Sequence, residues 1–140
     1  MLVKLSRVYH NRHERLLDSE YKTQLLALRR HAQSSIHEYW TVDRMASEIG
    51  LSTSRFSVIY RKQFHSSPME DIIEMRITEA KRLLVSTQYT MRQIAALCGL
   101  KNEYYFSRFF KEQVGVTPSI YRGKPGQSVP LKHEERLKEN

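Results

Sequence analysis

The chain has 140 residues, 40% of them hydrophobic, and its 23 Lys and Arg against 15 Asp and Glu give a net charge of +8. This length allows one domain or two very small ones, and the apolar content excludes wholesale disorder. The basic excess favours a polyanionic partner, with nucleic acid ahead of a membrane. No apolar run of about 18 residues is present, so no membrane partner is expected.

Apolar residues recur at helical spacing along most of the chain, and no alternating run predicts a sheet. The clearest stripes are Leu25, Leu28, Ala32 and Ile36, and then Ile72, Ile73, Ile77, Ala80 and Leu84. The sequence therefore predicts an all-α fold. Residues 1–20 show heptad-like spacing over barely two heptads, so they are either a helix that packs on a domain absent from this chain or a frayed leader.

Capping residues predict the helix boundaries. Thr41 caps a helix to about Ile49, Gly50 supplies the left-handed residue that ends it, and Ser52 caps a helix over 53–64. Further along, Pro68 opens a long helix over 69–86. Thr90 caps a helix to Cys98, and Gly99 ends that helix. Another helix runs from about Asn102 to Val114, and Pro118 opens a last short helix. The predicted organisation is a first helix-turn-helix subdomain over 21–68, a linker helix over 69–86, a second subdomain over 87–123 and a mobile tail over 124–140.

The two subdomains repeat one another. At an offset of 49 the matched pairs are Thr41/Thr90, Met45/Ile94, Ala46/Ala95, Ile49/Cys98 and Gly50/Gly99; at an offset of 50 they are Phe56/Phe106, Ser57/Ser107, Ile59/Phe109, Tyr60/Phe110, Gln63/Gln113 and Pro68/Pro118. The extra residue falls just after the glycine, inside the turn. A repeated pair of helices joined at a glycine is a helix-turn-helix arrangement.

Each second helix of the repeat has a predicted inner and a predicted outer face. Phe56, Ile59 and Tyr60, and likewise Phe106, Phe109 and Phe110, are spaced to face a core, while Ala46 and Ala95 are expected where two helices cross closely. The outer faces are Ser54, Ser57, Val58 and Arg61, and then Tyr104, Ser107, Arg108 and Lys111 with Asn102 and Glu103 at the helix start. Hydroxyls, basic groups and an aromatic suit a DNA major groove, and the alternative for each face is an ordinary solvated surface.

The linker helix suggests a reason for the duplication. About 16 helical residues span roughly 24 Å. We expect this rod to hold the two second helices near the roughly 34 Å that separates successive major grooves.

These motifs resemble the DNA-binding domain of the AraC/XylS family of bacterial transcription regulators. The resemblance covers about residues 28–122 and rests on IAALCGLKNEYYFSRFFKEQVGVTPSIYR in the second subdomain, RITEAKRLL in the linker and WTVDRMASEIGLS in the first subdomain. It implies a seven-helix, two-lobed domain that binds asymmetric double-stranded operators and usually activates transcription. It also implies that residues 1–20 are the end of, or the linker from, an effector-sensing domain absent from this chain.

The resemblance assigns roles to residues. Groove-facing positions fall on Ser54, Arg55, Ser57, Val58 and Arg61 and on Glu103, Tyr104, Ser107, Arg108 and Lys111, with phosphate contacts near Thr41, Lys62, Thr90 and Lys101. The chain departs from the family pattern at His65, where glycine is usual, and at Leu100 and Asn102. Val58 stands where the family often has a longer polar side chain that contacts bases. The first subdomain is therefore expected to specify bases weakly, through methyl contacts or shape.

Other residue groups give no sign of catalysis. His10, His13 and Glu14 can share a helix face, where we expect a solvated surface and no metal. Cys98, the single cysteine, matches Ile49 in the repeat, which predicts a buried structural thiol, and it fits a reducing, cytoplasmic location. Trp40 and Tyr39 are expected to pack. We therefore expect no cofactor and no enzymatic activity.

Three hypotheses follow, in order of preference. The first is a sequence-specific, double-stranded DNA-binding transcription regulator, acting as an activator, that inserts two recognition helices into successive major grooves. The second is a protein-interaction module whose helix faces dock a protein such as RNA polymerase. The third is a small-molecule binder with Trp40 and Tyr39 lining a pocket.

Overall fold

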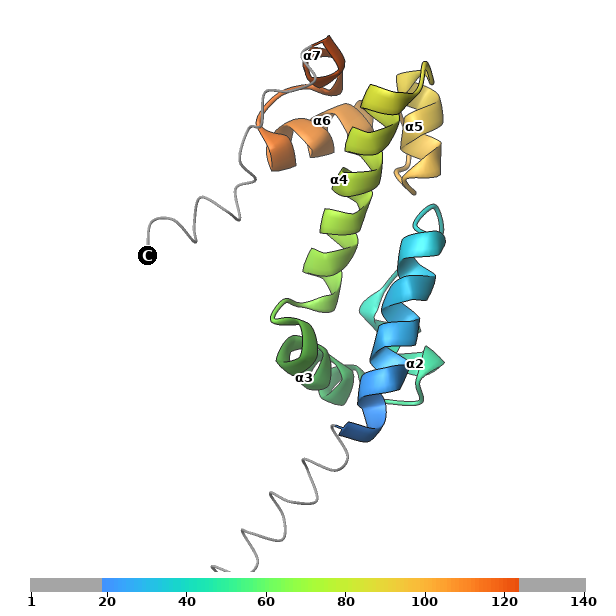
Figure 1. The fold of residues 1–140 in the computed structure, drawn as a ribbon, viewed down its shortest axis with the longest axis vertical. Coiled ribbons are helices and arrows are strands. Elements are labelled where there is room, and N and C mark those ends of the chain that lie inside the picture. The colour runs from blue at the N-terminus through green and yellow to red at the C-terminus, as the bar shows by residue number, and fades with distance from the viewer. Residues whose placement is uncertain (1–18, 124–140) are drawn as a thin grey trace, which may run out of the picture. The chain divides into compact units, whose positions relative to one another are not determined.

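The computed structural model describes residues 19–123, which form a helix over 19–34 and six further helices, with no strand in that range (Figure 1). The predicted all-α fold is therefore confirmed. None of the helices within 19–123 is both long enough and apolar enough to span a membrane. The expectations for most of the leader, for the tail and for His10, His13 and Glu14 lie outside the described residues.

The helices begin close to the predicted positions because polar side chains satisfy their first amide groups. Thr41 Oγ1 accepts a hydrogen bond from Arg44 N at 3.0 Å, Thr90 forms a capping box with Gln93, and Asn102 Oδ1 accepts from Tyr105 N at 2.7 Å. The helices are α2 (Val42–Glu48), α3 (Thr53–Phe64), α4 (Pro68–Ser86), α5 (Met91–Leu97), α6 (Glu103–Val114) and α7 (Pro118–Gly123).

The described residues divide into two compact units. The first unit contains the residues up to Ser35 and Trp40–Ile72, and the second contains Ile36–Tyr39 and the residues from Ile73 onward. The division falls inside α4, so this helix contributes to both cores. The first core includes Leu25, Trp40, Met45, Phe56, Tyr60 and Ile72, and the second includes Ile77, Leu84, Ile94, Cys98, Phe106 and Phe110.

The predicted inner faces are buried with one partial exception. Phe109 is only half-buried, and its ring stacks on the exposed Tyr105 with the centroids 6.3 Å apart. Ala46 and Ala95 are buried as predicted, and so is Cys98. These helix pairs therefore pack through the residues that the repeat indicated.

The two aromatic residues before α2 behave differently from one another. Trp40 is buried and its Nε1 donates a hydrogen bond to Ser35 O at 2.9 Å, as its predicted packing role requires. Tyr39 is 82% exposed, so the packing role predicted for it is wrong. Outside a helix, successive side chains point in different directions, and only the indole of Trp40 turns into the core of the first unit.

His65 ends α3 in the left-handed region, with φ 59°, where the matched residue of the second unit is Gly115 with φ 99°. A β-carbon in this region costs about 1–2 kcal/mol, part of which is offset because glycine has more freedom in the unfolded chain. We expect His65→Gly to raise the free energy of unfolding by about 0.5–1 kcal/mol in urea titrations. Gly115→His should lower it. A stability loss in His65→Gly would contradict this prediction.

Candidate nucleic-acid interface

In the first unit, a hydrogen bond joins the start of α3 to the start of α2. Thr53 Oγ1 donates a hydrogen bond to Asp43 Oδ1 at 2.8 Å, and Ser52 Oγ accepts from Arg55 N at 3.2 Å. Gly50, with φ 69°, makes the turn between the two helices. The orientation of α3 is thus fixed at its first turn by polar groups and along its length by its buried stripe.

A buried polar network holds the other side of α3. Asp71 is 3% exposed, it accepts a hydrogen bond from the Tyr60 hydroxyl, and its Oδ2 lies 2.9 Å from Arg29 Nε. Burial, followed by the hydrogen bond to Asp71, raises the pKa of the Tyr60 hydroxyl. The sequence patterns do not predict this network, and its one signal in the sequence is an acid placed directly before the apolar Ile72.

The outer face of α3 is open to solvent. Ser54, Val58 and Arg61 are exposed, and Arg55 and Ser57 are half-buried. Val58 keeps half of its surface exposed at the middle of this face. The face therefore offers hydroxyl donors and acceptors, two arginines and one apolar contact.

The second unit builds its helix pair around a tighter turn. Gly99 has φ 75°, and a β-carbon built there would lie 2.5 Å from Ile36 O. Phe106, Phe110 and Val114 anchor α6 in the core. The backbone of the segment before α2 thus packs directly against the turn that sets α6 in place.

The outer face of α6 carries more charged side chains than that of α3, and they include both signs. Glu103, Tyr104, Arg108 and Lys111 are exposed and Ser107 is half-buried. The Arg108 guanidinium lies 5.7 Å from the centroid of the Tyr104 ring, within the range of a cation–π interaction. This contact holds a basic group and an aromatic ring side by side on the exposed face.

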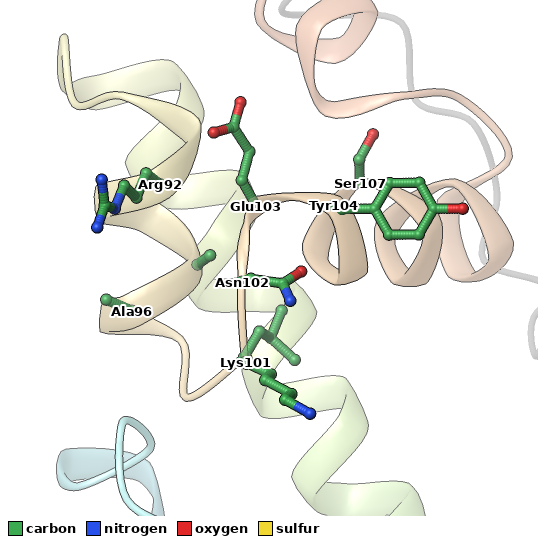
Figure 2. A pocket seen from close by; sticks show the side chains of 9 residues that line it. Arg92, Ala96, Lys101, Asn102, Glu103, Tyr104 and Ser107 are labelled. Carbon is green, nitrogen blue, oxygen red and sulfur yellow. The ribbon is translucent and has the colours of Figure 1, made fainter.

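A hollow of about 750 Å³ lies between α5 and the start of α6 (Figure 2). Its lining residues are Arg92, Ala95, Ala96, Leu100, Lys101, Asn102, Glu103, Tyr104 and Ser107. Arg92 comes from α5, and Glu103 and Ser107 point to the same side from α6 (Figure 2). The hollow therefore has a cation on one helix and an anion on the other.

The four residues predicted to contact phosphate all reach the surface. Thr41 is half-buried, and Thr90, Lys62 and Lys101 are exposed. Both threonine oxygens already accept a capping hydrogen bond, so what they retain for a phosphate is the O–H donor.

All ten predicted groove-facing residues lie on two helix faces, one on α3 and one on α6, and each is exposed or half-buried. Their contacts with DNA stay a prediction. Within residues 19–123, no group of three or more His, Cys, Asp and Glu is placed to hold a metal ion. The chemistry available on these faces is hydrogen bonding, charge and apolar contact.

Comparison with known proteins finds this architecture elsewhere. A family model described as a helix-turn-helix domain matches residues 45–124. The transcriptional regulator AlkR of Acinetobacter baylyi is 33% identical over 95 residues, which are 65% of this chain and 31% of that protein. GbdR of Pseudomonas aeruginosa is 28% identical over 101 residues, 71% of this chain and 28% of that protein.

Solved structures agree with these sequence relatives. The DNA-binding domain of AdpA, solved in complex with a target DNA, superposes with a TM-score of 0.67 at 27% identity, covering 71% of this chain and 89% of that one. A regulator from Chromobacterium violaceum, described as an AraC-type DNA-binding domain-containing protein, gives a TM-score of 0.62 at 25% identity and covers 77% and 97% of the two chains.

Two helix pairs, each turning at a glycine, define a tandem helix-turn-helix domain. The chain matches less than a third of the length of AlkR or GbdR. It belongs to the AraC/XylS-type helix-turn-helix family, as its motifs predicted.

Proposed function

We propose that the chain is a sequence-specific, double-stranded DNA-binding transcription regulator that places α3 and α6 in successive major grooves. The observation that carries this proposal is the outer face of α6, where Tyr104, Arg108 and Lys111 are exposed while the opposite side is anchored in the core. The complex of the AdpA domain with its target DNA supports the choice of duplex DNA as the partner.

The two kinds of contact divide between residue types. Arg61 and Lys111, with Lys62 and Lys101 nearby, neutralise phosphates and fix the position of the protein on the duplex. Arg108 reads a guanine, whose N7 and O6 both accept hydrogen bonds from a guanidinium. Ser54, Ser57 and Ser107 supply hydroxyls, and Val58 supplies an apolar contact suited to a thymine methyl group.

The family resemblance extends the proposal beyond this chain. Activation of transcription, contact with RNA polymerase and control by an effector bound to a domain outside this chain are parts of the same proposal. So are a cytoplasmic location and the absence of enzymatic activity. AlkR and GbdR, both named as transcriptional regulators, support the regulatory part.

Arg108→Ala tests the base-reading role. We expect a loss of about 1–3 kcal/mol in binding free energy on the preferred duplex, with relaxed preference at one base position, measured by fluorescence anisotropy on single-substitution duplexes. The matched control is Arg82→Ala, which removes the same charge from α4, where Arg82 pairs with Glu79 at 2.6 Å. An equal loss on every duplex would reassign Arg108 to a phosphate, and unchanged binding would contradict the proposed interface.

Salt titration of the same complexes tests the electrostatic part. With about six phosphates neutralised, the logarithm of the affinity should fall with the logarithm of the salt concentration with a slope of about −5. An affinity insensitive to salt would be incompatible with the contacts proposed here.

A further inference from the structure

One pair of matched positions differs between the units: the two side chains are hydrogen-bonded to each other in the first unit and not in the second. In the first unit, Thr53 at the start of α3 is hydrogen-bonded to Asp43 on α2 at 2.8 Å. The matched residues of the second unit are Glu103 and Arg92, at offsets of 50 and 49. Both are exposed and line the hollow between α5 and α6 (Figure 2).

Glu103 and Arg92 are not joined to one another. Among the residues the structure describes, neither side chain makes a hydrogen bond or an ion pair. The second unit therefore presents a carboxylate and a guanidinium, both with unused hydrogen-bonding capacity, at the place where the first unit has satisfied its polar groups internally.

A carboxylate on a face that approaches DNA is repelled by the phosphates, and a hydrogen bond from a donor on a base can offset that repulsion. An ionised carboxylate only accepts hydrogen bonds. In the major groove, guanine presents acceptors and thymine an acceptor and a methyl group, while adenine places an acceptor beside its amine. Cytosine presents only its N4 donor in the major groove, with no acceptor on the same base, so a glutamate discriminates in favour of cytosine.

We propose that Glu103 is a specificity-determining residue, accepting a hydrogen bond from the exocyclic amine of a cytosine, while Arg92 across the hollow holds a neighbouring phosphate. The inference rests on the proposed binding of duplex DNA and adds which base pair the start of α6 selects. Because Thr53 and Asp43 satisfy one another, the first unit makes no equivalent reading. A C·G pair is therefore required only in the half of the operator that α6 binds.

The test is selection of bound sequences from a random duplex pool by the full chain and its variants. The wild type should select a C·G pair at one position in the half bound by α6. Glu103→Gln should shift that position to A·T, because an amide matches the N6 and N7 of adenine. Glu103→Ala should reduce the preference for C·G over T·A at that position at least about fivefold and leave the other positions unchanged.

Two further variants separate the roles. Arg92→Ala should weaken binding to all duplexes together and reduce the salt slope by about 1, without changing the selected bases. Arg92→Asp combined with Glu103→Thr introduces the hydrogen-bonded Asp–Thr pair of the first unit and should abolish the C·G preference.

Thermal unfolding of each variant shows whether any loss comes from folding, since an acid in the first turn also interacts favourably with the helix dipole and stabilises the helix. Retention of every wild-type base preference by Glu103→Gln and Glu103→Ala overturns the inference while the proposed function stands. A wild-type chain that binds no duplex overturns both.

Discussion

Replacing Gly99 by alanine is expected to lower the free energy of unfolding by about 2–5 kcal/mol, whereas the same change at the matched Gly50 should cost about 1–2 kcal/mol. Both glycines lie in the left-handed region, at φ 75° and φ 69°. At Gly50 the added carbon meets nothing within 4 Å, but at Gly99 it would lie 2.5 Å from Ile36 O, a backbone atom that cannot rotate away. The difference between the two variants therefore isolates the close approach from the backbone strain.

The chain provides a separate probe for each unit. Trp40, its single tryptophan, is buried in the first unit, and Cys98, its single cysteine, is buried in the second. In urea titrations, Gly99→Ala should shift Cys98 alkylation to lower urea, and Gly50→Ala should produce the smaller shift, seen in Trp40 fluorescence. Equal shifts for the two variants would show that the contact with Ile36 O does not constrain the second turn.

Asp71→Ala is expected to lower the free energy of unfolding by about 2–4 kcal/mol. The change leaves the buried Tyr60 hydroxyl without its acceptor and removes the ion-pair partner of Arg29, whose side chain is still 37% exposed. Asp71→Asn, which keeps the size and one acceptor oxygen, should cost less. Chemical denaturation followed by Trp40 fluorescence measures both, and a cost for Asp71→Ala below that of Asp71→Asn would contradict the role of the network.

The same network predicts an alkaline limit to stability. Because burial and Asp71 raise the pKa of Tyr60 above its ordinary value of 10.0, the folded chain holds a proton that the unfolded chain releases. The stabilisation is complete below pH 10 and falls as the pH rises further. Burial likewise raises the pKa of the Cys98 thiol from 9.0 to about 12, which adds a loss between those values. Tyr60→Phe keeps the Cys98 contribution and should flatten the fall above pH 10.

The helix starts and the buried helix faces could be predicted from the sequence because their signals are local. The caps at Thr41, Ser52, Thr90 and Asn102 act on amides only three residues away, so the helix starts follow from neighbouring residues. The buried stripes follow from spacing alone, because helical periodicity places Phe106 and Phe110 on one face.

Features that depend on distant parts of the chain could not be predicted in the same way. The pairing of Arg29 with Asp71 joins residues 42 positions apart, and no periodicity indicates it. The contact of Gly99 with Ile36 also depends on tertiary packing, as does the difference between Trp40 and Tyr39. In the candidate interface, the sequence indicated the residues on each face but not that Arg92 and Glu103 border one hollow.

Footprinting of the full chain on its selected duplex tests the central claim, that one chain reads two successive major grooves. Hydroxyl-radical cleavage should show two protected patches on one face of the duplex, centred about one helical turn, roughly 34 Å, apart. Alanine substitutions on α3 and on α6 should each remove one patch. A single protected groove, or patches on opposite faces of the duplex, would contradict the account.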